Sequence, residues 1–178
     1  HVVALWGASK NRLPPGVYIL QPCILPRKSV ETSRVMVLIR CMTALVHRQF
    51  TWGRYNEDPM EIRIGHGYDI HRLDVHEAGG RPMVLGGVKI ECEVGPIAHS
   101  DGDVVLHAVT DAILSAIGEP DIGQLFPNTD PELAGEDSKN FLLEAIDRAN
   151  AGGWVIGNVD ITAICDQPKL GSHKEQIC

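Results

Sequence analysis

An aspartate and a histidine lie two residues apart in the stretch GHGYDIH, residues 65–71. Residues 62–71 open with isoleucines that alternate with other residues, a pattern that predicts a β-strand. Side chains two apart on a strand point to the same side, so Asp69 and His71 are expected to project together. Carboxylates and imidazoles are metal ligands. The alternative for an isolated pair of this kind is a strand end whose polar residues face water.

Residues 99–118, HSDGDVVLHAVTDAILSAIG, predict a helix. Ser100 or Asp101 is expected to cap its start, because Ser100-x-x-Asp103 resembles a capping box. Gly118 is expected to end it. Apolar residues at helical spacing predict one buried stripe, formed by Val105, Val109, Ala112 and Ala116.

The opposite face of this helix carries Asp103, His107 and Asp111, spaced four residues apart. A solvated polar face is the ordinary interpretation of such a pattern. However, His107 lies within an apolar helix, and a carboxylate one turn away would fix its tautomer and raise its basicity. We therefore expect His107 to join Asp69 and His71 as a third ligand.

One carboxylate and two imidazoles are typical of catalytic zinc sites, which leave one coordination position open for water or substrate. Manganese and cobalt tolerate the same ligands. His99, Ser100 and Asp101 directly precede the predicted helix, whose free N–H groups and dipole attract anions such as phosphate. An ordinary helix cap is the alternative there.

Other elements must position these groups. A second strand is expected within residues 79–91, and a long loop, a frequent place for functional residues, at 119–137. A second helix is expected from Ser138 to a stop at Gly152, and a further strand at 154–165. The inner face of the second helix is predicted to consist of Phe141, Leu142, Ala145, Ile146 and Ala149.

Composition is that of an ordinary globular protein, with 44% hydrophobic and 22% charged residues and a net charge of −7. This charge disfavours non-specific nucleic-acid binding. The five cysteines form no CxxC pair and are odd in number, which favours neither a disulfide framework nor a cysteine zinc site, and favours a reducing compartment. No apolar run reaches the roughly 18 residues of a membrane span.

Charge divides the chain in two. Residues 1–59 carry eight Lys or Arg and three Asp or Glu, whereas residues 60–178 carry eight and twenty. We expect residues 1–59 to be an N-terminal extension, either a transit peptide or non-native, disordered sequence, and 60–178 to be the functional domain. If translation starts at Met60 the protein is expected in the bacterial cytoplasm, and if 1–59 is a transit peptide, in a plastid.

From residue 62 onward the motifs IRIGHGYDIH, GGVKI, AHSDGDVVLHAVTDAILSAIG, DIGQLFPNTDP and GNVDITAICDQPK occur in this order. They resemble the 2-C-methyl-D-erythritol 2,4-cyclodiphosphate synthase family of the non-mevalonate isoprenoid pathway. The resemblance implies an α+β fold with a mixed β-sheet packed against helices, in a homotrimer with active sites between subunits. It covers about residues 62–178, and 1–59 has no counterpart.

The implied activity is that of a phosphorus–oxygen lyase. The 2-phosphate of 4-diphosphocytidyl-2-C-methyl-D-erythritol 2-phosphate attacks the β-phosphorus of the same molecule, which releases CMP and forms the cyclic diphosphate. The resemblance implies Zn²⁺ (or Mn²⁺ or Co²⁺) at Asp69, His71 and His107, and Mg²⁺ or Mn²⁺ bridging the substrate phosphates. No nucleic-acid or membrane partner is implied.

The resemblance also implies roles for individual residues. His99 is expected to stabilise the transition state. Substrate-binding residues are expected in five groups along the chain: Asp69, Ile70 and His71; His99 and Ser100; Asp121, Ile122 and Gly123; Phe126, Pro127, Asn128, Thr129 and Asp130; and Cys165, Asp166, Gln167, Pro168, Lys169, Leu170 and Gly171. The last group falls at the cytidine pocket of the family, and Asn128 stands where the family often has Asp.

The family continues for some forty residues beyond a position equivalent to Cys178, with a TTTE-like strand motif. We therefore expect this chain to be truncated at the C-terminus, and as such inactive or only partly folded. The first alternative function is a zinc phosphohydrolase at the same site, with water as the nucleophile. The second is a non-catalytic trimer or binding protein that keeps the fold.

Overall fold

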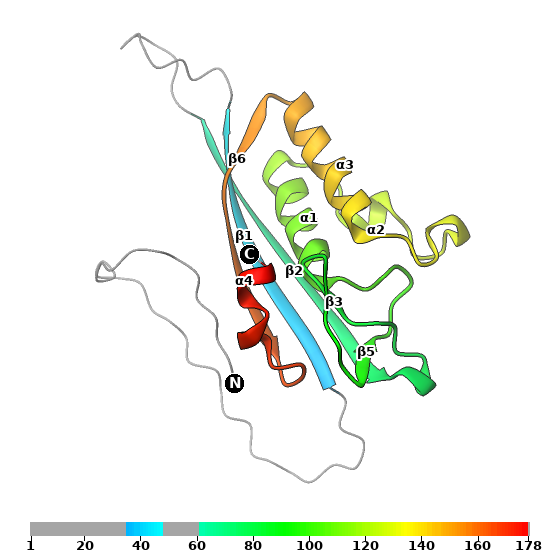
Figure 1. Cartoon of the computed structure of the whole chain (residues 1–178). Coiled ribbons are helices and arrows are strands. Elements are labelled where there is room, and N and C mark those ends of the chain that lie inside the picture. Colours follow the sequence, from blue (N-terminus) through cyan, green and yellow to red (C-terminus); the bar gives the residue numbers. More distant parts are fainter. Residues whose placement is uncertain (1–34, 48–60, 178) are drawn as a thin grey trace, which may run out of the picture.

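The computed structural model describes residues 35–47 and 61–177. A four-stranded sheet lies on one side, and the helices α1 and α3 cover one of its faces (Figure 1). The strand order is β5-β2-β1-β6, with β1 Val35–His47, β2 Ile62–Val75, β5 Val94–Pro96 and β6 Trp154–Cys165. The expected α+β class, a sheet packed against helices, is confirmed. Each pair of neighbouring strands in this sheet is antiparallel, so the expected mixed pairing is not found in the described residues.

Strand β1 lies between β2 and β6, at the centre of the sheet. Residues 35–46, VMVLIRCMTALV, are apolar and rich in β-branched residues, which suits a strand with a neighbour on each side. Cys41 and Leu45 are fully buried against the helical layer. The sequence analysis placed this segment in an extension without structure, whereas here it joins the sheet; the rest of 1–59 lies outside the described residues.

Helix α1 (Val104–Ile117) packs directly on β2. A Cβ atom at Gly67 would lie 1.8 Å from the backbone oxygen of Ala108, and one at Gly65 would lie 1.8 Å from that of Ala112. Only glycine leaves room for a helix backbone this close to a strand. The two glycines of GHGYDIH therefore set the distance between α1 and the strand that carries Asp69 and His71.

The start of α1 differs from the prediction. Asp103 is the N-cap, not Ser100 or Asp101, and its carboxylate accepts hydrogen bonds from four backbone N–H groups, those of Gly86, Gly87, Val105 and Leu106. Gly118 ends the helix in a left-handed conformation, as predicted. Because Asp103 also binds the turn between β3 (Val84–Leu85) and β4 (Val88–Lys89), it fixes this hairpin to the helix.

The second long helix, α3 (Ser138–Ala151), packs on α1 and is capped by Asp137. The predicted loop between the two helices contains two short turns of helix, α2 (Ile122–Leu125) and η2 (Pro131–Leu133). The remaining short elements are η1 (His76–Ala78), η3 (Leu170–Ser172) and α4 (Lys174–Ile177).

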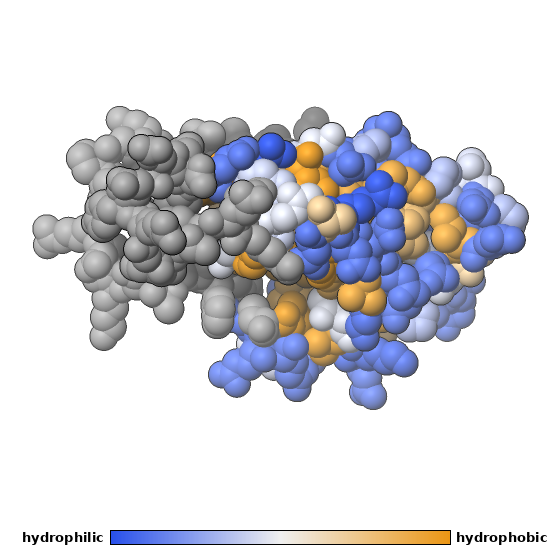
Figure 2. Space-filling model, turned by 90° about the horizontal axis from the view of Figure 1, so that it is seen from above, coloured by the Kyte–Doolittle hydropathy of each residue, from blue (hydrophilic) through white to orange (hydrophobic). Residues whose placement is uncertain are grey.

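The core lies between the sheet and the helices. The predicted stripe of α1 is buried in full, as are Phe141, Ala145 and Ala149 of α3. Among the described residues, the surface seen from above is mostly polar and is interrupted by apolar patches (Figure 2). Within the described residues, no helix combines the length and the apolar character that crossing a membrane requires.

Candidate functional site

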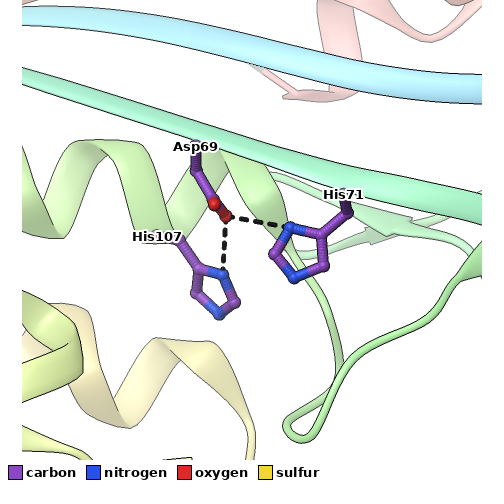
Figure 3. Close-up of side chains that lie close together, drawn as sticks. All are labelled: Asp69, His71 and His107. Carbon is purple, nitrogen blue, oxygen red and sulfur yellow. Dashed lines mark hydrogen bonds and ion pairs between the residues drawn. The ribbon is translucent and has the colours of Figure 1, made fainter.

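Three side chains from two elements converge between β2 and α1 (Figure 3). Asp69 and His71 leave β2 on the same side, as the strand alternation predicts. His107 reaches them from the first turns of α1. Asp69 Oδ2 lies 2.9 Å from His107 Nδ1 and 3.1 Å from His71 Nδ1. The ligand atoms of the three residues all lie within 4.8 Å of one another, so that one ion can contact all three.

The donor set and its surroundings fit a divalent metal. His71 Nδ1 is buried and has no hydrogen-bond partner, since its contact with Asp69 is not aligned as a hydrogen bond. A buried imidazole nitrogen without a partner is costly unless something else binds it. Burial by itself would raise the pKa of Asp69, but the hydrogen bond from His107 and the adjacent His71 outweigh burial and hold that pKa below its usual range. Asp69 is thus held as a carboxylate, the form that binds metal.

The prediction that Asp103 orients His107 is wrong. The carboxylate of Asp103 is engaged by backbone N–H groups, whereas both ring nitrogens of His107 have other neighbours. Its Nδ1 contacts Asp69, and its Nε2 lies 2.8 Å from Ser138 Oγ and 3.2 Å from Ser100 Oγ. The sequence analysis did not identify Ser138 as a site residue, because its only local signal is that of a helix start.

A cavity of about 260 Å³ opens beside the three ligands. Of the residues predicted to bind substrate, the cavity is lined by His71, His99, Ser100, Ile122, Gly123, Phe126 and Asn128. Its wall also contains residues that the sequence did not indicate as site residues, namely Ile97, Ala98, Leu133 and Phe141. Phe141 and Phe126 have ring centroids 4.6 Å apart, so α3 and the long loop together form an apolar wall.

Contacts with main-chain oxygens position His99 at the cavity. His99 Nε2 lies 2.8 Å from the backbone oxygen of Asp130. Because a carbonyl oxygen only accepts, Nε2 carries the proton in this contact. The Arg81 guanidinium donates to the backbone oxygens of Ala98 and His99 at 2.9 and 3.0 Å. Arg81 therefore fixes the loop that presents His99, a role for which the sequence gave no signal.

Other predicted substrate residues lie elsewhere. Ile70 points to the outer face of the sheet. Asp121 borders a second cavity, which Asp111 also lines. Hydrogen bonds from Gln124 lower the pKa of Asp121. The group Cys165–Gly171 begins at the last residue of β6 and does not line the main cavity. The remaining predicted residues outside its lining are Asp69, Pro127, Thr129 and Asp130; Asp69 lies against His71, and the backbone oxygen of Asp130 contacts His99.

Comparison with known proteins decides the family. The model of the YgbB family matches residues 62–178. The chain belongs to the YgbB family. Its first matched residue is also the first residue of β2, so that β1 lies outside the matched range.

Two relatives of this chain are named as the same enzyme. The chain is 53% identical over 116 residues to a 2-C-methyl-D-erythritol 2,4-cyclodiphosphate synthase of Proteus mirabilis (strain HI4320), a match covering 65% of this chain and 70% of the relative. It is 48% identical over 118 residues to a chloroplastic synthase of the same name from Catharanthus roseus, covering 66% of this chain and 48% of the relative. The resemblance drawn from the motifs is confirmed.

A solved structure of 2C-methyl-D-erythritol-2,4-cyclodiphosphate synthase in its CDP-bound form superposes on this chain. The TM-score is 0.51 at 42% sequence identity, and the match covers 64% of this chain and 73% of that one. The fold of the YgbB chain is therefore that of a solved synthase over most of the described residues.

Proposed function

We propose that the function of this protein is the cyclisation of 4-diphosphocytidyl-2-C-methyl-D-erythritol 2-phosphate to 2-C-methyl-D-erythritol 2,4-cyclodiphosphate, with release of CMP. One observation carries the proposal: Asp69, His71 and His107 meet beside a cavity, in a member of a family whose relatives are named as this synthase. The enzyme is then a phosphorus–oxygen lyase of isoprenoid biosynthesis.

The reaction suits what these residues can do. The nucleophile is a phosphate that already carries negative charge, so no strong base is needed to create it. The protein must instead hold two mutually repelling phosphates in line and offset their charge. A divalent ion held by Asp69, His71 and His107 would supply Lewis-acid polarisation of a phosphate oxygen.

Side chains near the start of α1 bind and orient the substrate in this proposal. His99 and Ser100 line the cavity beside His71 and His107. His99 donates through Nε2 to Asp130, so its Nδ1 is the nitrogen left to face a substrate oxygen. The rings of Phe126 and Phe141 contact each other in the cavity wall, and such an apolar wall would strengthen electrostatic contacts with a bound substrate.

We assign the remaining substrate contacts from the family resemblance. Asp121–Gly123 and Phe126–Asp130 belong to the loop over the cavity, and two members of each group line it. Cys165–Gly171 lie away from this cavity, so we propose that they contact the cytidine in a site shared with a neighbouring subunit. The CDP-bound relative supports a ligand of that class.

For the metal we propose Zn²⁺, with Mn²⁺ or Co²⁺ as substitutes, since one carboxylate and two imidazoles are common ligands of catalytic zinc. A second ion, Mg²⁺ or Mn²⁺, would bridge the substrate phosphates. Metal analysis of the purified chain, before and after dialysis against a chelator, measures both the identity and the number of bound ions.

We also propose a homotrimer. The outer face of β2 is mostly apolar and uncovered among the described residues: Ile62, Ile64 and Tyr68 are 52, 68 and 48% exposed. His66 lies between Ile64 and Tyr68, opposite Met42 of β1, which is 41% exposed. A contiguous apolar face of this kind marks a protein interface more often than a solvated surface. Packing of this face against other copies of the chain would bury it.

For domain and compartment we keep the two alternatives given by the sequence. Residues 60–178 are proposed as the synthase domain. The protein is cytoplasmic if translation starts at Met60, and plastidial if residues 1–59 are a transit peptide. N-terminal sequencing of the protein isolated from its source distinguishes these outcomes.

The test of activity is incubation of the 178-residue chain with the cytidine diphosphate substrate, Zn²⁺ and Mg²⁺, followed by ³¹P NMR. Cyclic diphosphate and CMP in equal amounts are expected. Linear phosphate products would instead support the zinc phosphohydrolase. No turnover by a zinc-loaded, folded chain would support the inactive fragment that the sequence analysis expects. The Asp69→Ala variant serves as the blank for spontaneous breakdown.

A further inference from the structure

The ring of His107 is held at both nitrogens. Nδ1 faces Asp69 Oδ2 at 2.9 Å, on the side where an ion can bind. Nε2 faces away from that side and lies 2.8 Å from the hydroxyl oxygen of Ser138. Ser138 is fully buried at the first turn of α3, so water does not compete for this contact. The more distant Ser100 hydroxyl, at 3.2 Å, also accepts from the N–H of Gly102.

The Ser138 hydroxyl is bound in turn to the carboxylate of Asp101. That carboxylate also accepts from the backbone N–H of Ser138 at 3.1 Å and from the N–H of Asp103 at 3.0 Å. A carboxylate surrounded by donors acts only as an acceptor. Its bond with the Ser138 hydroxyl therefore runs from Ser138 to Asp101.

This direction fixes the next bond. A hydroxyl has one proton, and that of Ser138 is given to Asp101, so toward His107 the hydroxyl oxygen can only accept. The proton between Ser138 and His107 must then sit on Nε2 of the ring. A neutral imidazole protonated at Nε2 has its lone pair on Nδ1. In the absence of an ion, Nδ1 contacts the Asp69 carboxylate; an ion bound between the two would take the Nδ1 lone pair and replace that contact.

We propose that Asp101 and Ser138 are positioning residues that hold metal-bound His107 as its Nε2–H tautomer and aim Nδ1 at the ion. The inference rests on the proposed metal site and adds to it a relay from the segment before α1, through the start of α3, to the ligand. Outer partners of this kind commonly change metal affinity by about 10- to 100-fold when removed.

The relay also links the packing of the two helices to the metal site. Asp101 lies just before α1, and Ser138 begins α3, 37 residues further along the chain. His107 therefore keeps its orientation only while α3 is docked on α1. Neither residue needs to touch the substrate for this effect.

The first test measures Zn²⁺ affinity of the full chain by competition with a chromophoric chelator. Ser138→Ala removes the acceptor for Nε2–H, and Asp101→Asn supplies an amide that can donate to Ser138 and reverse the relay. Each is expected to bind Zn²⁺ about 10- to 100-fold more weakly than the wild type. Ser138→Thr, which keeps the hydroxyl, is expected to restore most of the affinity.

The matched control is Asp137→Ala. Asp137 is the N-cap of α3 and the neighbour of Ser138, but its side chain binds the N–H of Lys139 and does not reach His107. This variant weakens the helix start without touching the relay, so its Zn²⁺ affinity is expected to equal that of the wild type. An equal loss in Asp137→Ala and Ser138→Ala would mean that only helix docking matters, and would overturn the proposal.

The second test needs no variant and covers the case in which Ser138→Ala does not fold. Histidine-directed ¹⁵N–¹H NMR of the zinc-loaded wild type is expected to show His107 protonated at Nε2 and bound through Nδ1. The opposite tautomer, or a folded Ser138→Ala with wild-type affinity, would overturn the relay alone. A wild-type chain that binds no Zn²⁺ would instead overturn the proposed function together with the inference.

Discussion

The two faces of strand β2 differ in burial, in side-chain size and in polarity. The inner face runs through Gly65, Gly67, Asp69 and His71, toward α1. The outer face carries Ile62, Ile64, Tyr68 and Ile70, each more than a third exposed. The inner face is thus completed within the chain, whereas the outer face is apolar and has no cover among the described residues.

This difference shows how the strand serves two purposes. On the inner face the glycines remove side chains so that α1 can approach, and this approach brings His107 to Asp69. On the outer face none of the bulky residues lines the main cavity, and the proposed homotrimer would bury them. Changes on the two faces should therefore affect different properties of the protein, and four predictions examine that separation.

The largest effect is expected from a side chain on the inner face. In Gly67→Val, the new Cβ would meet the Ala108 backbone oxygen at 1.8 Å. A rigid helix backbone cannot yield to that overlap, so a loss of more than about 4 kcal/mol in the free energy of unfolding is expected. Urea unfolding followed by circular dichroism measures it. Ile64→Val on the outer face is the control; a folded Gly67→Val with wild-type stability would refute the close packing of α1.

The next effect concerns the ligands. His107→Ala is expected to reduce Zn²⁺ affinity by more than the roughly 100-fold typical of losing an outer partner, because a ligand itself is lost. Elemental analysis and activity with added Zn²⁺ measure the result. His66→Ala, a histidine from the outer face of the same strand, should retain one Zn²⁺ per chain. Equal zinc content in both variants would contradict the assignment.

A charge on the outer face should act on assembly alone. Ile64→Glu places a carboxylate in the apolar face, where burial in an interface would cost several kcal/mol. The trimer is expected to give way to monomers in size-exclusion chromatography with light scattering, while circular dichroism stays unchanged. Ile64→Leu is the matched control. A variant that remains trimeric would exclude this face as the interface.

The smallest effect is expected at Asp111 of α1, which borders the second cavity together with His66 and Tyr68. Burial raises the pKa of Asp111, and the negative charges of Asp121 and Asp69 raise it further. The hydrogen bond from the backbone N–H of Ile122 lowers this pKa but does not cancel the increase. A raised folded-state pKa means that stability falls as pH rises from the unfolded value through the folded one.

Asp111→Asn keeps an oxygen for the Ile122 N–H but has no charge. It should therefore melt slightly higher than the wild type at pH 7, and the difference should shrink as the pH approaches about 4, the usual pKa of an aspartate. Thermal melts across that range measure it. If the difference in melting temperature between the variant and the wild type grew toward low pH, the raised pKa of Asp111 would be contradicted.

Much of the structure could be predicted from local patterns. The alternation in IRIGHGYDIH defined β2 and the shared direction of Asp69 and His71, and helical spacing in residues 104–117 defined α1 with its buried stripe. Strand β6 begins and ends where its sequence predicted. These features were predictable because each depends on neighbours within one strand or one helix.

The errors arose where partners are distant in the sequence. Asp103 has the spacing to orient His107, yet its carboxylate caps α1 and binds the β3–β4 turn. Strand β1 has apolar residues on both faces, with Cys41 and Leu45 buried against the helices and Met42 exposed on the outer face, so its sequence shows no polar alternation and was interpreted as part of an extension. Sequence spacing cannot show which of several nearby groups a side chain will choose.

The amino-acid sequence by itself determined the ligand types, the elements that carry them and the family, because these follow from residue identity and short-range periodicity. Only the tertiary structure decided that β1 lies between β2 and β6, that His107 contacts Ser138, which in turn binds Asp101, and that the outer face of β2 has no cover among the described residues. Each of these depends on hydrogen bonds or packing between segments tens of residues apart, whose formation is set by the whole fold.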